Sequence, residues 1–260
     1  MSRFLPLVFF YLVAELQAQV HVNSTGCGTT NFCVFKPKGC DPNLDCTVGV
    51  VVSIVGSNQM RVQMAAQTLI PPVQQQYVAV AFSDDIEMGN DTVTECVLSD
   101  AAAFVDPEVY LSYNKGKAND RVYLHDEEHK QMFSNIEAEF VDGRLMCQFT
   151  QQLVPQFDHK DGLVFDLNRP FFMFAATGSA QPDEINVHDL NKGSHFFPVV
   201  SDVPFIPTSL ASEFSHPTGY TPPPPMPKAP RPSFAVKKSA AQSSVYRFLT
   251  LAIVSSLFHL

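Results

Sequence analysis

Short apolar runs, several of them alternating with polar residues, recur between residues 47 and 176 of this chain. The alternation is clear at residues 136–140, where apolar side chains are separated by two glutamates, as in a half-buried strand. Asp142 and Gly143 follow as a hairpin-turn signal. Further runs dense in Val, Ile, Phe and Tyr predict strands at residues 47–55, 59–70, 77–83, 109–113, 145–150 and 171–176, with another beginning near Thr92.

Helical periodicity is weak, and only residues 127–133 predict a short helix. Many short strands separated by turns are typical of two packed sheets. We therefore expect an all-β fold, a two-sheet antiparallel immunoglobulin-like sandwich over residues 27–203. The chain of 260 residues is long enough for one such domain with extensions.

Both ends of the chain carry processing signals. Residues 1–18 combine Arg3, an apolar run and a small residue at Ala18, which predicts a cleaved secretory signal peptide. Residues 204–238 are rich in proline and predict an extended stalk. Residues 239–260 run from small residues through a polar spacer to an apolar tail, the pattern of a GPI-anchor signal with Ser239 as the attachment site. We expect a protein on the outer face of the plasma membrane.

Six cysteines remain in the expected mature chain, and an even number in a secreted protein predicts three disulfides. They are Cys27, Cys33, Cys40, Cys46, Cys96 and Cys147. The first four lie in a segment with Gly, Pro and Asn, so we expect disulfides to staple that segment. A Cys33–Cys40 pair is feasible as a local loop, and the other four would then tie the segment to the strands of Cys96 and Cys147. Sequence alone leaves every pairing open.

Charge and composition narrow the function. The formal net charge of −9 argues against nucleic-acid binding, which needs a basic face. The chain has 22 phenylalanines and no tryptophan, which indicates an aromatic core or pocket. Two sequons, at Asn23 and Asn90, predict N-glycosylation, and a glycan on Asn90 would crowd any site formed by the neighbouring turn.

The most informative segment is residues 78–93, an apolar strand followed by an acidic turn and a second strand. Its phrase FSDD-x-x-MGND-x-V places one methionine, Met88, in a polar turn, where its thioether gains little from burial. The phrase resembles the DOMON family of extracellular β-sandwich modules, several of which bind haem b or a sugar. The resemblance covers the β-rich region and implies that Met88 is an axial ligand of a haem iron.

A second axial ligand is then needed, and the resemblance implies a histidine after a late strand that ends in a small-residue turn. His188 has this position after residues 171–176, and His195 is the alternative. No C-x-x-C-H motif occurs, so a covalently attached haem is excluded. A Met/His pair raises the reduction potential of haem and leaves no open site for oxygen. Such a centre carries electrons, and we do not expect the chain to be an enzyme on its own.

Other residues near the motif admit two interpretations. The four phenylalanines Phe82, Phe171, Phe172 and Phe174 are candidates for a porphyrin pocket or for the sandwich core, because only half of a strand's side chains face one side. The acidic residues around Met88 (Asp84, Asp85, Glu87 and Asp91) fit a solvated loop, a surface that steers a basic partner, or a calcium site. His125 to His129 match H-x-x-E-H, a zinc-protease pattern, but a charged loop explains them more simply.

The resemblance therefore implies a cell-surface haem b electron-transfer module like the DOMON part of ferric-chelate-reductase-like proteins. Those proteins usually add a transmembrane cytochrome b, so we expect this chain to work with a separate membrane cytochrome b or a small reductant such as ascorbate. The alternative is a non-redox module for sugar or ligand binding, or for adhesion, since one sandwich serves many uses.

Overall fold

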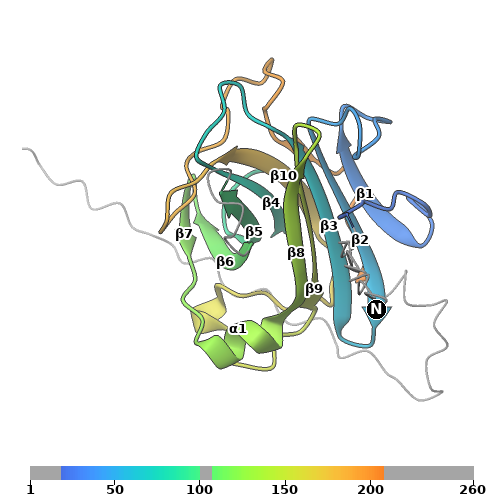
Figure 1. The fold of residues 1–260 in the computed structure, drawn as a ribbon. Coiled ribbons are helices and arrows are strands. Elements are labelled where there is room, and N and C mark those ends of the chain that lie inside the picture. The colour runs from blue at the N-terminus through green and yellow to red at the C-terminus, as the bar shows by residue number, and fades with distance from the viewer. Residues whose placement is uncertain (1–18, 100–106, 208–260) are drawn as a thin grey trace, which may run out of the picture. The chain divides into compact units, whose positions relative to one another are not determined.

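A computed structural model describes residues 19–99 and 107–207 of the chain. These residues form two antiparallel sheets that pack face to face (Figure 1). One sheet has five strands in the order β1-β2-β3-β9-β8, and the other has six in the order β11-β10-β4-β5-β6-β7. The prediction of an all-β sandwich is confirmed. The expected signal peptide, the stalk beyond residue 207 and Ser239 lie outside the described residues.

The strands follow the apolar runs of the sequence. The five-stranded sheet contains β1 (Asn31–Lys36), β2 (Val48–Gly56), β3 (Gln59–Gln67), β8 (Phe133–Val141) and β9 (Arg144–Gln152). The six-stranded sheet contains β4 (Gln75–Ser83), β5 (Asp91–Ser99), β6 (Glu108–Lys115), β7 (Ala118–Arg121), β10 (Phe172–Ser179) and β11 (Val199–Val200). The expected turn at Asp142 and Gly143 joins β8 to β9, with positive φ at both residues.

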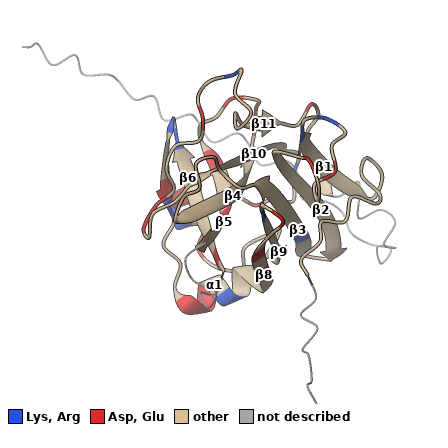
Figure 2. Cartoon of the chain, turned by 45° about the horizontal axis from the view of Figure 1, so that its top comes forward, with Lys and Arg blue, Asp and Glu red and all other residues tan. Residues whose placement is uncertain are grey.

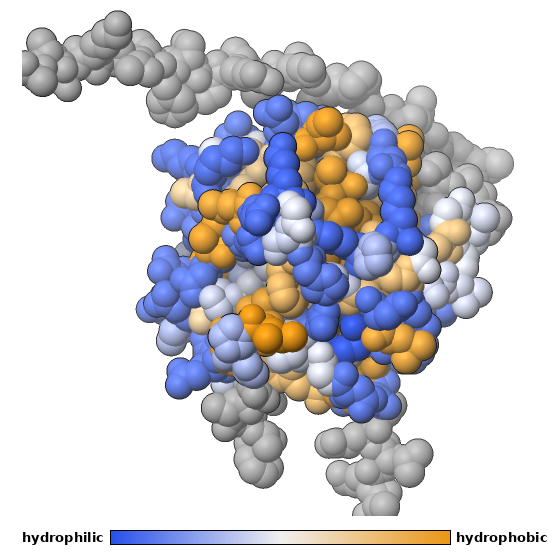
Figure 3. Space-filling model, turned by 90° about the horizontal axis from the view of Figure 1, so that it is seen from above, coloured by the Kyte–Doolittle hydropathy of each residue, from blue (hydrophilic) through white to orange (hydrophobic). Residues whose placement is uncertain are grey.

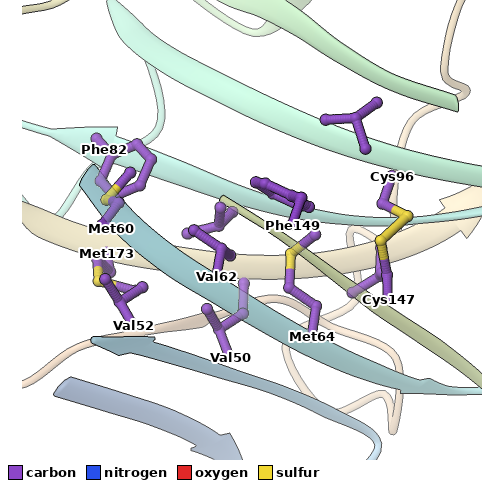
Figure 4. Close-up of a cluster of buried hydrophobic side chains, with 14 of the residues drawn as sticks. Val50, Val52, Met60, Val62, Met64, Phe82, Cys96, Cys147, Phe149 and Met173 are labelled. Carbon is purple, nitrogen blue, oxygen red and sulfur yellow. A yellow bond between two sulfur atoms is a disulfide. The ribbon is translucent and has the colours of Figure 1, made fainter. Parts of the chain in front are cut away.

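The core lies between the two sheets and takes one face of each strand. Val50, Val62 and Phe149 come from the five-stranded sheet and meet Phe82 and Met173 of the other (Figure 4). Phe205 is also buried and pairs with Phe171 through two backbone hydrogen bonds, so packing continues past residue 203. In Figure 2 the charged residues lie largely on loops and on the helix α1 (Asp126–Met132).

The expected disulfide pairing is wrong. Cys27 pairs with Cys33, Cys40 pairs with Cys46, and Cys96 pairs with Cys147. The first two bridges do staple the N-terminal segment, as expected, but each joins cysteines within that segment and neither connects it to the strands of Cys96 and Cys147. Cys33 lies within β1 beside Cys27, whereas Cys40 lies in the loop after that strand. Cys96 of β5 and Cys147 of β9 both point into the core, where their bridge joins the two sheets (Figure 4).

A buried arginine holds the second local loop against the sheet. Arg144, at the start of β9, is 4% exposed, and its guanidinium donates to the carbonyl oxygens of Pro42, Leu44 and Cys46. Burial lowers the pKa of this guanidinium, while the nearby carboxylates of Asp41 and Asp45 oppose the shift. The guanidinium therefore supplies hydrogen-bond donors to loop carbonyl oxygens that have no strand partner.

The inter-sheet bridge should contribute more stability than either local bridge. It closes a separation of 51 residues, against 6 for Cys27–Cys33. Chain entropy assigns about 4 kcal/mol to the long loop and about 2 kcal/mol to the short one. We expect Cys96→Ala/Cys147→Ala to lower the free energy of unfolding in urea roughly twice as much as Cys27→Ala/Cys33→Ala. Equal losses would show that chain entropy does not govern these bridges.

Candidate functional site

The outer face of the six-stranded sheet carries a cavity of about 790 Å³. Its floor is formed by outward-facing residues of β4, β5 and β10. Ala79 and Ala81 of β4 and Ala176 of β10 are small, and they leave space between the larger Val93 and Phe174. This volume is typical of sites for small molecules and cofactors, and such sites are also mostly lined by apolar side chains, as this floor is.

One side of the cavity is formed by the turn between β4 and β5, which carries Met88. The backbone of this turn is tightly held. Lys117 Nζ donates to the Met88 carbonyl oxygen at 2.7 Å, and the Gly89 amide donates to Asp91 Oδ2 at 2.8 Å. Gly89 has φ of 140°, and a Cβ there would lie 3.1 Å from the Gly116 carbonyl oxygen. Only glycine lets the turn lie this close to the β6–β7 hairpin.

The other side is formed by residues 180–198, which leave β10, pass over the sheet and return as β11 (orange in Figure 1). We call this stretch the His188 segment. Near its start, Asn186 N donates to the Ser179 carbonyl oxygen and Asn186 Nδ2 donates to Ser179 Oγ. Near its end, Lys36 Nζ of β1 donates to the carbonyl oxygens of Ser194 and Phe197. The segment is thus tied to both sheets.

A buried ion pair fixes the beginning of the His188 segment. Glu95 of β5 is fully buried, and its Oε2 accepts from Arg121 Nε at 3.1 Å. Arg121 Nη1 donates to the Pro182 carbonyl oxygen at 2.7 Å, and the guanidinium carbon lies 3.7 Å from the Tyr110 ring centroid. Burial raises the pKa of the Glu95 carboxyl, against hydrogen bonds from Ser112 and Arg121 that lower it. Burial also raises the pKa of Tyr110, to about 12.

The ring of His188 is held in one tautomer. Its Nδ1 lies 3.0 Å from the carbonyl oxygen of Asp189. A carbonyl oxygen can only accept, so this hydrogen bond requires the proton on Nδ1. In the neutral imidazole, Nε2 then keeps its lone pair. This arrangement is the usual one for a histidine that binds a metal through Nε2.

Met88 and His188, the two residues singled out in the sequence, both line the cavity. Both are half-buried. No other histidine within residues 19–99 and 107–207 lines it. The alternative ligand, His195, is engaged elsewhere: its Nε2 lies 2.7 Å from Gln67 Oε1 and 2.9 Å from Thr47 Oγ1.

The candidate phenylalanines divide between the core and the cavity. Phe82 and Phe171 point inward and are fully buried, so they belong to the core. Phe174 lines the cavity, and Phe172 is on the same outer face of β10 without lining it. The alternation along β10 explains this division, because residues 172 and 174 share a face that residues 171 and 173 do not.

The acidic turn is mostly, but not wholly, a solvated loop. Asp84, Asp85 and Glu87 are exposed, Asp84 pairs with Arg169, and Asp85 Oδ1 accepts from the Glu87 amide. Asp91 instead is fully buried in the cavity wall, where its Oδ2 also accepts from Asn114 Nδ2. Among the described residues, no three potential metal ligands of this turn lie close enough together to hold an ion. One such cluster, Cys40, Asp45 and Cys46, lies elsewhere, and its two cysteines form a disulfide.

The H-x-x-E-H motif lies on α1 and its N-cap, so the expected charged loop is instead a short helix. The Glu128 carboxylate accepts from the His125 amide at 2.8 Å and completes a capping box. Glu128 also pairs with Lys160 at 2.6 Å, and His129 Nε2 lies 2.7 Å from the Val109 carbonyl oxygen. The Glu128 carboxylate and His129 Nε2, two of the three groups that a zinc-protease site would use, are therefore engaged elsewhere.

Both sequon asparagines are exposed. Asn23 lies in the segment before β1, and its Oδ1 accepts from the Thr25 amide. Asn90 has φ of 61° at the end of the Met88 turn. Three large apolar side chains beside the cavity, Ile86, Val187 and Leu190, are 61%, 66% and 70% exposed. Figure 3, seen from above Figure 1, shows apolar patches of this kind between hydrophilic side chains.

The sequence reasoning missed Lys36, Glu95 and Arg121, which hold the His188 segment. Glu95 did carry a signal, because it is one charged residue inside the otherwise uncharged run Thr92 to Leu98. A charge at the centre of a buried strand needs a partner. Its partner, Arg121, lies on β7, and no sequence pattern identified it as the residue that pairs with Glu95.

Residues 44–178 match the family model of the DOMON domain, and the chain belongs to this family. Ferric-chelate reductase 1 of Bos taurus is 27% identical over 168 residues, which are 64% of this chain and 25% of that protein. Ferric-chelate reductase 1 of Mus musculus is 26% identical over 164 residues, which are 62% of this chain and 24% of that protein. The chain thus spans about a quarter of these relatives.

A solved structure, the cytochrome domain of Myriococcum thermophilum cellobiose dehydrogenase, aligns with 69% of this chain and 83% of that one. Its sequence identity is 10%, and the TM-score is 0.42. Separately, none of the helices within the described residues is long and apolar enough to span a membrane.

Removal of Arg121 should destabilise the domain in a pH-dependent way. Arg121→Ala leaves Glu95 buried without its cation, a loss of about 3–5 kcal/mol near pH 8. Since burial already holds the pKa of Glu95 above its ordinary value, the folded state takes up a proton as the pH falls, and the deficit shrinks between pH 8 and pH 5.5. Urea unfolding across this range measures the effect.

The control is Arg121→Ala/Glu95→Gln, which removes the titrating carboxyl. It should regain most of the lost free energy of unfolding at pH 8 and show no comparable recovery at pH 5.5. A deficit that stays constant with pH in the single variant would argue against an uncompensated charge on Glu95.

Proposed function

We propose that this DOMON domain is a haem b-binding electron-transfer module of the cell surface, with Met88 and His188 as the axial ligands of the iron. The observation that carries the proposal is that these two residues line one cavity. The relatives support a redox role, because their names are those of ferric-chelate reductases.

The residues around the cavity fit a haem. The apolar floor of Ala79, Ala81 and Ala176 suits the face or edge of a porphyrin. His188 presents Nε2 with its lone pair because Nδ1 donates to the Asp189 carbonyl oxygen. Met88 offers a neutral thioether from a turn that Lys117 and Asp91 hold in place. When bound, the haem would supply one-electron chemistry with a potential raised by methionine ligation.

The protein's own part is to orient the ligands and to keep water away. Arg121 and Lys36 hold the two ends of the His188 segment, so the imidazole would need little reorganisation on binding. Phe174, Val93 and Ile185 surround the floor with apolar side chains. A low-dielectric pocket of this kind tunes the potential of a metal centre.

The alternative is a non-redox domain that binds a sugar or another ligand, or acts in adhesion. Asn114 and Asn119 line the cavity and are the residue type that recognises sugar hydroxyls. However, Asn119 Nδ2 donates to Asn114 Oδ1 and Ser112 Oγ, and Asn114 Nδ2 donates to Asp91 Oδ2. Because both asparagine amides already donate within the protein, we favour the haem.

Electron transfer requires a donor and an acceptor. We propose a separate membrane cytochrome b, or a small reductant such as ascorbate, as the partner of the domain. We further propose the layout expected from the sequence: a signal peptide over residues 1–18, the domain over residues 27–203, a stalk over residues 204–238 and a GPI signal over residues 239–260, except that the stalk starts after Phe205, which still packs in the core. The lipid anchor would tether the domain to the membrane, and the stalk would lift it off the surface.

Haem reconstitution tests the main proposal. The purified domain mixed with ferric haem should give a sharp Soret band that shifts on reduction with dithionite, as expected of a six-coordinate iron. His188→Gly should lose this spectrum and regain it when free imidazole is added. Met88→Ala should lose the band assigned to the thioether ligand and lower the reduction potential.

His195→Gln is the matched control, because His195 does not line the cavity, and its spectrum should equal that of the wild type. A wild-type protein that is colourless after unbound haem has been removed by gel filtration, while binding glycans on an array, would support the sugar-binding alternative. Equal spectra for wild type and His188→Gly would rule out the proposed ligand pair.

The anchor is tested on cells that express the full chain with an epitope tag between residues 19 and 27. Phosphatidylinositol-specific phospholipase C should release the tagged protein into the medium. Replacement of the small residues at Ser239, Ala240 and Ala241 by Leu should abolish release and surface display. Surface protein that resists the enzyme in the wild type would contradict a GPI anchor.

A further inference from the structure

We propose that Lys192, with Lys117 in a weaker role, binds the carboxylates of the porphyrin and so fixes its orientation in the cavity. This inference rests on the proposed function. Haem b carries two propionate groups on one edge, and an apolar cavity must leave these anions in water or pair them with cations. Within the described residues, Lys117 and Lys192 are the two lysines that line this cavity, and no arginine lines it.

Each lysine is attached to one of the two ligand-bearing segments. Lys117 Nζ donates to the carbonyl oxygen of Met88. Lys192 follows His188 by four residues in the same segment. An anion bound between the lysines would therefore connect both walls of the cavity, and the two cations would mark the edge where the carboxylates lie.

The negative charges in the cavity make the lysines unequal. Asp91 and Glu87 line the cavity with Met88, and Asp91 is fully buried. These carboxylates repel an anion near Lys117, whose ammonium already holds the Met88 carbonyl oxygen. The acidic neighbour of Lys192 is Asp189, whose carboxylate accepts from the Asn191 amide and from the side chain of Ser194, contacts that lower its pKa.

Lys192 is thus the better site for an anion. It is exposed, and its ammonium makes no hydrogen bond or ion pair with the rest of the described chain. A propionate beside it would stay near solvent, while the apolar part of the ring would lie over the alanine floor. Exposed ion pairs contribute modestly, so the expected effect is a few-fold change in affinity.

The experiment compares haem b with its dimethyl ester, in which both carboxylates are blocked. Release of each porphyrin from the domain to excess apomyoglobin is followed by absorbance. For haem b, Lys192→Gln should release the ligand about three- to fivefold faster than wild type, and Lys117→Gln should have a smaller effect. For the dimethyl ester, wild type and both variants should release at equal rates.

Lys130→Gln is the control, since Lys130 is an exposed residue of α1 paired with Glu127. It should match wild type with both porphyrins. Lys192→Gln should also lower the reduction potential, because a cation near the iron favours the ferrous state. A general loss of stability would speed the release of both porphyrins, so a change confined to haem b reports on its carboxylates.

Equal acceleration for haem and ester, or none for either, would overturn the role of Lys192 while leaving Met88 and His188 as ligands. The absence of a Soret band in wild type with either porphyrin would instead refute the proposed function, and this inference would fall with it.

Discussion

The six-stranded sheet buries apolar side chains on both of its faces, and this constraint determines most of what surrounds the cavity. Along β4, Val78, Val80 and Phe82 enter the core, while Ala79 and Ala81 face outward and are still buried. An outward face of this kind must be covered by something other than water. The His188 segment and the Met88 turn cover its edges, and the small alanines keep the middle open.

The loops that cover the sheets form few backbone hydrogen bonds of their own, so side chains from the strands and from the β6–β7 turn hold them in place. Lys36 and Arg121 donate to carbonyl oxygens of the His188 segment, Lys117 does so for the Met88 turn, and Arg144 does so for the Cys40–Cys46 loop. The same device recurs because a long cation can reach an irregular backbone and satisfy several acceptors at once. Fixed loops can then present ligands in one geometry.

Much of the fold and part of the site could be predicted from the sequence, for reasons that are specific to each element. Strands and the Asp142–Gly143 turn were visible because β8 alternates and because that turn needs residues that tolerate positive φ. Met88 was visible because a lone thioether in an acidic turn is unusual. Whether Phe82 faces the core or a pocket could not be predicted. The run Val78 to Phe82 is apolar throughout, so its sequence does not indicate which side of the strand is the core.

The rest depended on contacts between residues distant in sequence. The pair Cys96–Cys147 depends on which side chains face each other across the two sheets, which spacing alone does not give. The pairing of Glu95 with Arg121 depends on the order β5-β6-β7. The helix α1 (Asp126–Met132), by contrast, was expected from the sequence at residues 127–133, and its start is a local feature, because Glu128 accepts from the His125 amide.

The hydrogen bonds from Lys36 to the His188 segment have a consequence for the order in which a newly made chain folds. Its two acceptors lie 158 and 161 residues further along the chain, so this contact closes nearly the whole domain upon itself. Contacts of such long range form late, because the entropy of a large loop must first be lost. We therefore expect the wall that carries His188 to be completed after the sheets have paired, so that a newly made chain would have a folded scaffold before it had a place to receive its ligand.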